Sequence, residues 1–312
     1  MTRVAVTSRS FSRHPILRAE LLARYPQTTF NDDGVQLVGA ALVAFLKGHD
    51  KAITALEILD DAVFAALPEL KVIGKYGVGM DMIDLDAMSK RGVKLGWTGG
   101  VNRRSVSELA ISFAIGLLRH VPAAQREVLH GTWRQHVGRQ LSGKTVGIIG
   151  CGHVGKDLVR MLQPFGCAVL AHDIKDYAAF YEEFGVRPVD LETLLKEADV
   201  VSIHTPLDAS TRNILSAERL ALMKSDAVLI NLARGGLVDE AALAAMLSEG
   251  QLAAAGFDVF ATEPPQDDLL LGLPNFLVTP HIGGSSEEAI LAMGRAAIAG
   301  LDSFGDPLEI SK

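Results

Sequence analysis

Short runs of β-branched and apolar residues alternate with longer helical patterns from the start of the chain. Apolar residues recur at helical spacing in segments such as 16–23 and 35–46. Strands are predicted between such segments, at residues 4–7, 27–30, 52–54, 71–75 and 93–97. This alternation predicts an α/β fold in which a doubly wound parallel sheet is covered by helices.

A second series of strands begins after a long predicted helix. Ser105 and Glu108 match a capping box in front of an apolar helical pattern, so we expect a connecting helix to begin at Ser105. A last helical pattern covers residues 287–301. Further strands are predicted at 145–149, 169–172, 200–204, 227–232, 254–259 and 276–279. The sequence therefore predicts two domains, residues 1–98 with 286–312 and residues 99–285.

Composition and charge exclude several classes of protein. Of the 312 residues, 48% are hydrophobic and 21% are charged, as expected for a soluble globular chain. The net charge of -7 provides no basic field for nucleic acid. The start lacks a secretory signal, and the apolar stretch at 37–46 is too short to cross a bilayer. We expect a cytoplasmic protein, with neither nucleic acid nor membrane as a partner.

The two cysteines have no spacing that indicates chemistry. Cys151 and Cys167 form neither a C-x-x-C pair nor a metal-ligand pattern. No metal site is expected, and a reducing compartment fits this cysteine usage.

A glycine-rich turn follows the predicted strand at 145–149. Gly150, Gly152 and Gly155 form G-x-G-x-x-G directly before a helical pattern. The first glycine permits a tight turn, the second lets a pyrophosphate approach the backbone, and the third allows close packing of helix and strand. The helix N-terminus then attracts phosphate. The motif alone also occurs in ordinary turns, so its position between strand and helix matters.

Asp173 follows the next predicted strand, close to the spacing of about 20 residues at which an acidic group binds ribose hydroxyls. A surface acid at a strand end is the alternative. Because a carboxylate repels a 2′-phosphate, the sequence favours NAD over NADP, although Lys175 lies close enough to weaken this preference.

Two other strand ends carry residues suited to carboxylate binding and proton transfer. Arg234 follows the strand at 227–232, at the sheet edge where open α/β folds bind ligands, and a guanidinium suits a planar carboxylate. A surface or helix-capping arginine is the alternative. His281 follows the strand at 276–279 beside two glycines, and imidazole suits acid–base catalysis near neutral pH.

Glu263 lies just beyond the strand that carries Asp258, so it can reach His281 in the fold and hold the imidazole tautomer. We interpret the side chains of the other eight of the nine histidines, including His204 and His153, as structural.

In this order and spacing, the segments GCGHVGK, NLARGGLVDE, FDVFATEPP and TPHIGGSS resemble the D-isomer-specific 2-hydroxyacid dehydrogenases, which include phosphoglycerate, glycerate and D-lactate dehydrogenases. KYGVGMDMIDLDA and residues 105–109 also match, so the resemblance covers nearly the whole chain. It implies an NAD-dependent oxidoreductase of the short form, without a regulatory domain. It further implies a flavodoxin-like substrate domain and a Rossmann cofactor domain flanking a cleft that closes by a hinge.

The resemblance also implies a role for each matching residue. Arg234 would orient the substrate, His281 would exchange the proton, and Glu263 would pair with His281. The backbone of Val78 and Gly79 would bind the substrate carboxylate, and Asp258 would face the nicotinamide carboxamide. Cofactor contacts are implied at Gly150, Gly152, His153, Val154, Gly155, Asp173, Thr205, Pro206, Ala233, Asp258, Gly283 and Gly284.

The substrate stays open at this point. Lys75 ends a predicted strand before Gly77-Val78-Gly79, where a basic residue of phosphoglycerate dehydrogenases meets the substrate phosphate. Arg103 or Arg104 could assist it. The alternative is that Lys75 is a solvated strand end and that the two arginines lie on the exposed flank of a loop. Glyoxylate, hydroxypyruvate and D-lactate-type substrates are also open. An NAD(H)-sensing corepressor or scaffold of the same fold is the non-enzyme alternative, disfavoured by the intact catalytic set.

Two further expectations concern the chain outside the site. The loop at 97–102 lacks the proline that the family usually has, which leaves its conformation open. The resemblance implies a homodimer formed through the second domain, with residues 130–136 as an arm. Trp133 in that segment fits either an arm or a core position.

Overall fold

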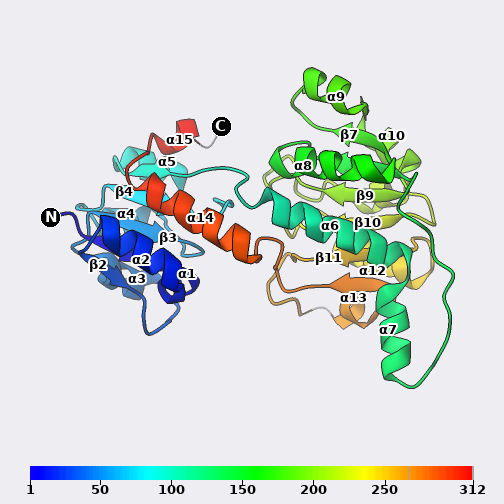
Figure 1. Ribbon diagram of the computed structural model, residues 1–312, viewed down its shortest axis with the longest axis horizontal. Coiled ribbons are helices and arrows are strands. Elements are labelled where there is room, and N and C mark those ends of the chain that lie inside the picture. The colour runs from blue at the N-terminus through cyan, green and yellow to red at the C-terminus, as the bar shows by residue number, and fades with distance from the viewer. Residues whose placement is uncertain (267, 311–312) are drawn as a thin grey trace. The chain divides into compact units, whose positions relative to one another are not determined.

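The computed structural model describes residues 1–266 and 268–310 of the chain, which divide into two units (Figure 1). Met1–Asn102 with Glu287–Lys312 form the first unit, and Arg103–Ser286 form the second. The predicted boundaries fell between residues 98 and 99 and between residues 285 and 286. Residues 311–312 of the predicted first domain lie outside the described part. Each unit contains one parallel sheet, which confirms the predicted fold class of two doubly wound α/β domains.

The first unit is built on five parallel strands in the order β2-β1-β3-β4-β5, which is a flavodoxin-like order. The strands are β1 (Val4–Val6), β2 (Thr28–Phe30), β3 (Lys51–Thr54), β4 (Val72–Lys75) and β5 (Lys94–Gly96). The helices are α1 (Arg9–Arg13), α2 (Pro15–Arg24), α3 (Gly39–Leu46), α4 (Asp61–Ala65), α5 (Leu85–Lys90), α14 (Glu287–Gly300) and α15 (Pro307–Ile310).

The C-terminal helix α14 belongs to this first sheet, although it follows the second unit in the sequence. It packs on β4 and β5, and its red ribbon lies over the cyan strands in Figure 1. A Cβ atom on Gly96 would lie 2.0 Å from the carbonyl oxygen of Gly300, so the two backbones approach as closely as only glycine permits. Leu301 then completes the core beneath Phe11 and Leu17.

The second unit is built on seven parallel strands in the order β12-β11-β10-β9-β6-β7-β8. The strands are β6 (Thr145–Ile149), β7 (Ala168–His172), β8 (Val186–Pro188), β9 (Val200–Ile203), β10 (Val228–Asn231), β11 (Ala254–Phe257) and β12 (Phe276–Val278). The order reverses between β6 and β9, as in the Rossmann fold, and a separate hydrophobic cluster covers each face.

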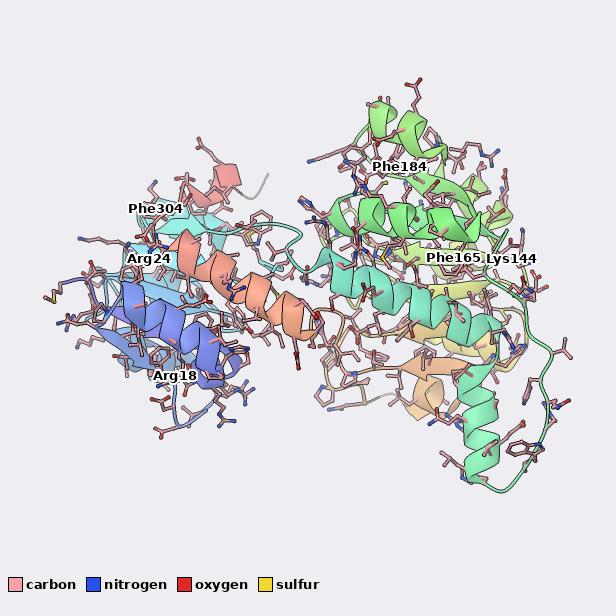
Figure 2. All side chains as sticks on the ribbon, viewed as in Figure 1. Arg18, Arg24, Lys144, Phe165, Phe184 and Phe304 are labelled. Atoms are coloured by element: carbon pink, nitrogen blue, oxygen red, sulfur yellow. The ribbon has the colours of Figure 1, made fainter. Side chains whose placement is uncertain are left out.

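The helices of the second unit are α6 (Arg103–Leu118), α7 (Val121–Leu129), α8 (His153–Leu162), α9 (Ala178–Phe184), α10 (Leu191–Glu197), α11 (Ala217–Leu220), α12 (Glu240–Ser248) and α13 (Asp268–Gly272), and a 3₁₀ turn covers Gln163–Phe165. Helix α9 packs on α8 through cation–π contacts. Lys156 Nζ lies 3.4 Å from the ring centre of Tyr177, and Arg160 Cζ lies 5.3 Å from that of Phe184, which is labelled in Figure 2.

The capping box predicted at Ser105 is wrong. Helix α6 begins at Arg103, and the Ser105 hydroxyl donates a hydrogen bond to the carbonyl oxygen of Gly283 at 2.7 Å. Arg104 lies in this helix and not on the flank of a loop. Its guanidinium binds both carboxylate oxygens of Asp157 on α8, at 2.9 and 3.1 Å. With these tertiary contacts, the helix begins two residues earlier than the local sequence signature predicts.

No single helix in the described part of the chain has the length and apolar character needed to span a membrane. Only α6 and α7 taken together reach that length and composition, and they are bent by 65° relative to each other.

Candidate active site

The predicted site residues of the second unit follow the carboxyl ends of its strands, which all lie at one edge of the parallel sheet. The glycine turn follows β6, and Thr205 and Pro206 follow β9, on the two sides of the point where strand order reverses. The Arg234, Asp258 and His281 segments follow the neighbouring strands β10, β11 and β12. Open α/β sheets bind ligands outside such a reversal point.

The glycine turn is closed toward the protein and open on its other side. A Cβ atom on Gly150 would lie 2.8 Å from the backbone of His204, and one on Gly155 would lie 2.3 Å from the carbonyl oxygen of Gly150. A Cβ atom on Gly152 would meet nothing within 4 Å. No side chain caps the N-terminus of α8, which begins at His153 and Val154. This end of α8 is therefore suited to a phosphate group.

Asp173 ties the end of β7 to this turn. Its carboxylate accepts hydrogen bonds from the backbone N–H of Cys151 at 2.6 Å and of Lys175 at 2.8 Å. The side chain is half-buried, and a carboxylate has about four acceptor positions. Positions remain for ribose hydroxyls, so the residue fits the adenosine half of NAD.

Thr205 carries an unsatisfied polar atom beside the same turn. Its hydroxyl oxygen is buried and has no hydrogen-bond partner among the described residues. Leaving such a group unpaired costs about 1–3 kcal/mol, so the hydroxyl at this place suits a ligand that supplies a hydrogen-bond partner. Together with the open face of Gly152, it supports the fit of a dinucleotide. The next residue, Pro206, accepts a hydrogen bond from the hydroxyl of Thr211 at 2.7 Å.

Asp258 holds the turn that carries His281. Its side chain is 1% exposed, and one carboxylate oxygen accepts from the Thr279 hydroxyl at 2.5 Å and from the Ile282 N–H at 2.7 Å. The other oxygen accepts from the Gly283 N–H at 2.7 Å, and Gly284 follows in the turn. The backbone carbonyl of Asp258 accepts from the His281 N–H at 2.9 Å. Asp258 thus positions the turn, a role that the sequence did not indicate.

His281 and Glu263 form the predicted pair. The Nδ1 atom of His281 lies 2.9 Å from Oε2 of Glu263, and Oε1 of Glu263 accepts from the Phe260 N–H at 3.1 Å. No hydrogen bond to Nε2 of His281 is seen within the described residues. Because Nδ1 faces a carboxylate, it carries a proton, and Nε2 is left to exchange the other one. The imidazole side chain is 49% exposed, so this nitrogen is accessible.

Arg234 lies in a turn fixed by the buried amide of Asn231, which sequence reasoning missed. The Asn231 amide donates to the Arg234 carbonyl at 2.9 Å and accepts from the Ala233 N–H at 3.1 Å. The guanidinium donates one hydrogen bond to the Ala233 carbonyl at 2.7 Å. A Cβ atom on Gly235 would lie 1.9 Å from the Phe260 backbone, so this turn packs directly against the segment leading to Glu263.

The first unit holds the remaining candidates. Lys75 is 3% exposed, and its amine donates to the carbonyl oxygens of Ala55 at 2.5 Å and of Tyr76 at 3.4 Å. The alternative of a solvated strand end is therefore wrong for Lys75. The Trp97 indole donates to the Val78 carbonyl at 3.0 Å, which anchors the loop that lacks the family's proline.

Comparison with known proteins identifies the family. The family model for the D-isomer specific 2-hydroxyacid dehydrogenase NAD binding domain matches residues 111–283. The chain belongs to this family. Its members are NAD-dependent oxidoreductases that act on CH–OH groups. The family assignment made from the sequence is thus confirmed.

Individual relatives differ in their substrates. The chain is 41% identical to the D-3-phosphoglycerate dehydrogenase of Methanocaldococcus jannaschii over 72% of its own length, but that region spans only 44% of the relative. It is 38% identical to the hydroxypyruvate reductase of Thermotoga maritima, over 77% of the chain and 79% of the relative. The D-lactate dehydrogenase of Lactobacillus jensenii, solved with NAD+, is 29% identical with a TM-score of 0.81, covering 96% and 95% of the two chains.

Two titratable groups near the glycine turn are held neutral at pH 7. Burial raises the pKa of the Cys151 thiol to about 11, which makes it a poor nucleophile at neutral pH. Burial lowers the pKa of His204 to about 4, and its ring bonds to the Ser202 hydroxyl at 2.9 Å. Both findings agree with the structural interpretation of these side chains.

The low pKa of His204 predicts a loss of stability in mild acid. As pH falls below about 6.5, the unfolded state takes up a proton at this residue, whereas the folded state takes it up only near pH 4. We expect the free energy of unfolding to drop by about 1–2 kcal/mol between pH 7 and pH 5 because of this group. Urea titrations should show a smaller drop for His204→Gln, and equal drops in both proteins would contradict the assignment.

Proposed function

We propose that this chain is an NAD-dependent D-2-hydroxyacid dehydrogenase that interconverts a small 2-oxo acid and its 2-hydroxy acid. The observation that carries the proposal is the 2.9 Å contact between His281 and Glu263, in a turn held by Asp258. A positioned imidazole with one accessible nitrogen is suited to proton exchange with a carbonyl oxygen.

Three residues of the chain have separate roles in the proposed reaction. Arg234 orients the substrate carboxylate and stabilises negative charge on the carbonyl oxygen, because its donors form a fixed fork. The Nε2 atom of His281 delivers a proton to that oxygen in reduction and removes it in oxidation. Glu263 holds the tautomer and stabilises the imidazolium. NADH, when bound along the glycine turn, supplies the hydride.

An NAD(H)-sensing corepressor or scaffold remains the competing function, and one assay separates the two. NADH consumption is measured against a panel of 2-oxo acids with the full chain. Reduction of at least one member supports the enzyme. NADH binding without turnover of any member would favour the sensor.

We expect His281→Ala to bind NADH normally and to lose about 10²–10⁴-fold in turnover, because a positioned acid–base group contributes that much. NADH binding is followed by fluorescence, and turnover by NADH consumption. His49→Ala, which alters a histidine of the first unit that bonds to Thr29, should retain full activity. A His281→Ala variant with near-normal rates would remove this residue from the mechanism.

Asp173 is proposed to set the preference for NAD. In Asp173→Ser, the ratio of kcat/KM for NADH over NADPH should fall by about tenfold or more, since a like charge no longer opposes the 2′-phosphate. The exposed Asp176 provides a matched control, and Asp176→Ser should leave the ratio unchanged. Equal use of both cofactors by the unmodified protein would refute this role.

We also propose a cytoplasmic homodimer. The free thiols Cys151 and Cys167 suit a reducing compartment. Helix α7 has no buried residue, and it leaves the sheet of the second unit together with the segment that follows it (Figure 1). Trp133 and Val137 in that segment are 85% and 95% exposed, so the core alternative for Trp133 is wrong. An exposed apolar patch of this kind is typical of a protein interface.

The dimer proposal predicts a change in mass in solution. We expect Trp133→Ser with Val137→Ser to shift the protein toward the monomer in light scattering, because apolar contact area is lost. Val35→Ser, at an exposed apolar residue of the first unit, should have no effect. A monomeric unmodified protein would end the dimer proposal.

A further inference from the structure

The start of α6 contacts two elements of the second unit that carry different parts of the candidate site. Helix α6 packs on α8, which begins at the glycine turn, and on β12, which leads to the His281 turn (Figure 1). Side chains of residues 104–107 bond to both parts, and we name these residues the bridging segment. Because the two parts lie far apart in the sequence, their relative position depends on contacts of this kind.

One side of the bridging segment holds the peptide group of Gly283, two residues after His281. The Ser105 hydroxyl donates to the Gly283 carbonyl at 2.7 Å, and the Asp258 carboxylate accepts from the Gly283 N–H at 2.7 Å. The methyl groups of Val106 lie 3.6 and 3.9 Å from the position of a Cβ atom on Gly283. Since Gly283 is buried, loss of the Ser105 hydroxyl would leave its carbonyl without a partner among the described residues and favour a shift of the turn.

The other side of the bridging segment contacts α8. Arg104 and Ser107 are three residues apart and therefore share one face of α6. The guanidinium of Arg104 binds both carboxylate oxygens of Asp157. The hydroxyl of Ser107, which is 0% exposed, donates to the Val154 carbonyl at 3.3 Å. These contacts fix the first two turns of α8 against α6.

The charge of Asp157 bears on phosphate binding. Its side chain is 6% exposed and lies in the second turn of α8, near the end of the helix that is suited to phosphate. A carboxylate there opposes an incoming anion, and burial limits the screening of its charge by water. The paired donors of Arg104 compensate this charge. Arg104 thus preserves the attraction of the helix end for phosphate.

We propose that the bridging segment sets the position of the His281 turn relative to the cofactor helix α8. Ser105 is a positioning residue for the reaction of the bound cofactor, and Arg104 is a positioning residue for cofactor binding. The inference rests on the proposed 2-oxo acid reductase activity. It assigns the two properties to neighbouring residues, so each can be changed without the other.

The first test measures a single turnover with the full chain. The protein, in excess over NADH, is mixed with a saturating concentration of its best 2-oxo acid substrate, and NADH absorbance is followed. In Ser105→Ala the rate constant should fall by about tenfold, because a misplaced imidazole slows proton transfer to the carbonyl oxygen. The amplitude and the Kd for NADH should stay unchanged. A merely structural role would lower the amplitude, which reports the folded fraction, and leave the rate constant as it is.

Two further variants control this test. Ser112→Ala removes the hydroxyl of an exposed serine on the same helix and should leave the rate constant unchanged. Ser105→Thr keeps a hydroxyl and should recover most of the rate. A normal rate constant in Ser105→Ala, or a loss confined to its amplitude, overturns the inference alone. If the unmodified protein reduces no 2-oxo acid, the proposed function fails, and this inference with it.

The second test addresses cofactor binding by fluorescence titration with NADH. In Arg104→Gln the Kd should rise by about fivefold or more, because the buried carboxylate of Asp157 loses its countercharge. The single-turnover rate constant at saturating NADH should stay within about twofold of the original. Combining Arg104→Gln with Asp157→Asn removes both charges and should recover most of the affinity, which separates the charge effect from a loss of folding. An unchanged Kd in Arg104→Gln, or equally weak binding by the single and double variants, would contradict the role of Arg104.

Discussion

A buried carboxylate at the end of β11 fixes the geometry on which the proposed chemistry depends. Asp258 accepts three hydrogen bonds from the segment after β12, and its backbone carbonyl accepts a fourth. Bonds to an ionised acceptor are about twice as strong as neutral ones, so they can hold a turn that includes a residue in an unfavourable conformation. His281 has a φ of 56°, in the left-handed region that side chains other than glycine rarely adopt. In this conformation the imidazole lies 2.9 Å from the Glu263 carboxylate.

The site residues of the second unit were predictable because each follows a strand. In a parallel sheet, all carboxyl ends meet at one edge, so a strand assignment is enough to place Arg234 and His281 near neighbouring strands. The glycine turn was equally clear, since β6 has the predicted bounds, Thr145–Ile149, and the spacing of Gly150, Gly152 and Gly155 is local information. The pairing of Glu263 with His281 also agrees with the structure.

Features that depend on contacts between distant residues were missed or misplaced. Ser105 has the sequence signature of a helix cap, yet its hydroxyl bonds to Gly283, which lies far along the chain. Lys75 resembles a solvated strand end in the sequence, but its amine donates a hydrogen bond to the carbonyl oxygen of Ala55, which directly follows the neighbouring strand β3. Strand β8, Val186–Pro188, is too short to show a periodic hydrophobic pattern, and it contains a proline. The sequence therefore did not predict it.

The most direct test of the account is oxidation of the two enantiomers of one 2-hydroxy acid with NAD+, followed by the appearance of NADH. The acid chosen is the product of the best 2-oxo acid substrate, and each enantiomer is supplied in pure form. The account predicts that NADH accumulates with the D enantiomer and that the L enantiomer is inert. Oxidation of the L enantiomer at a comparable or higher rate would contradict it.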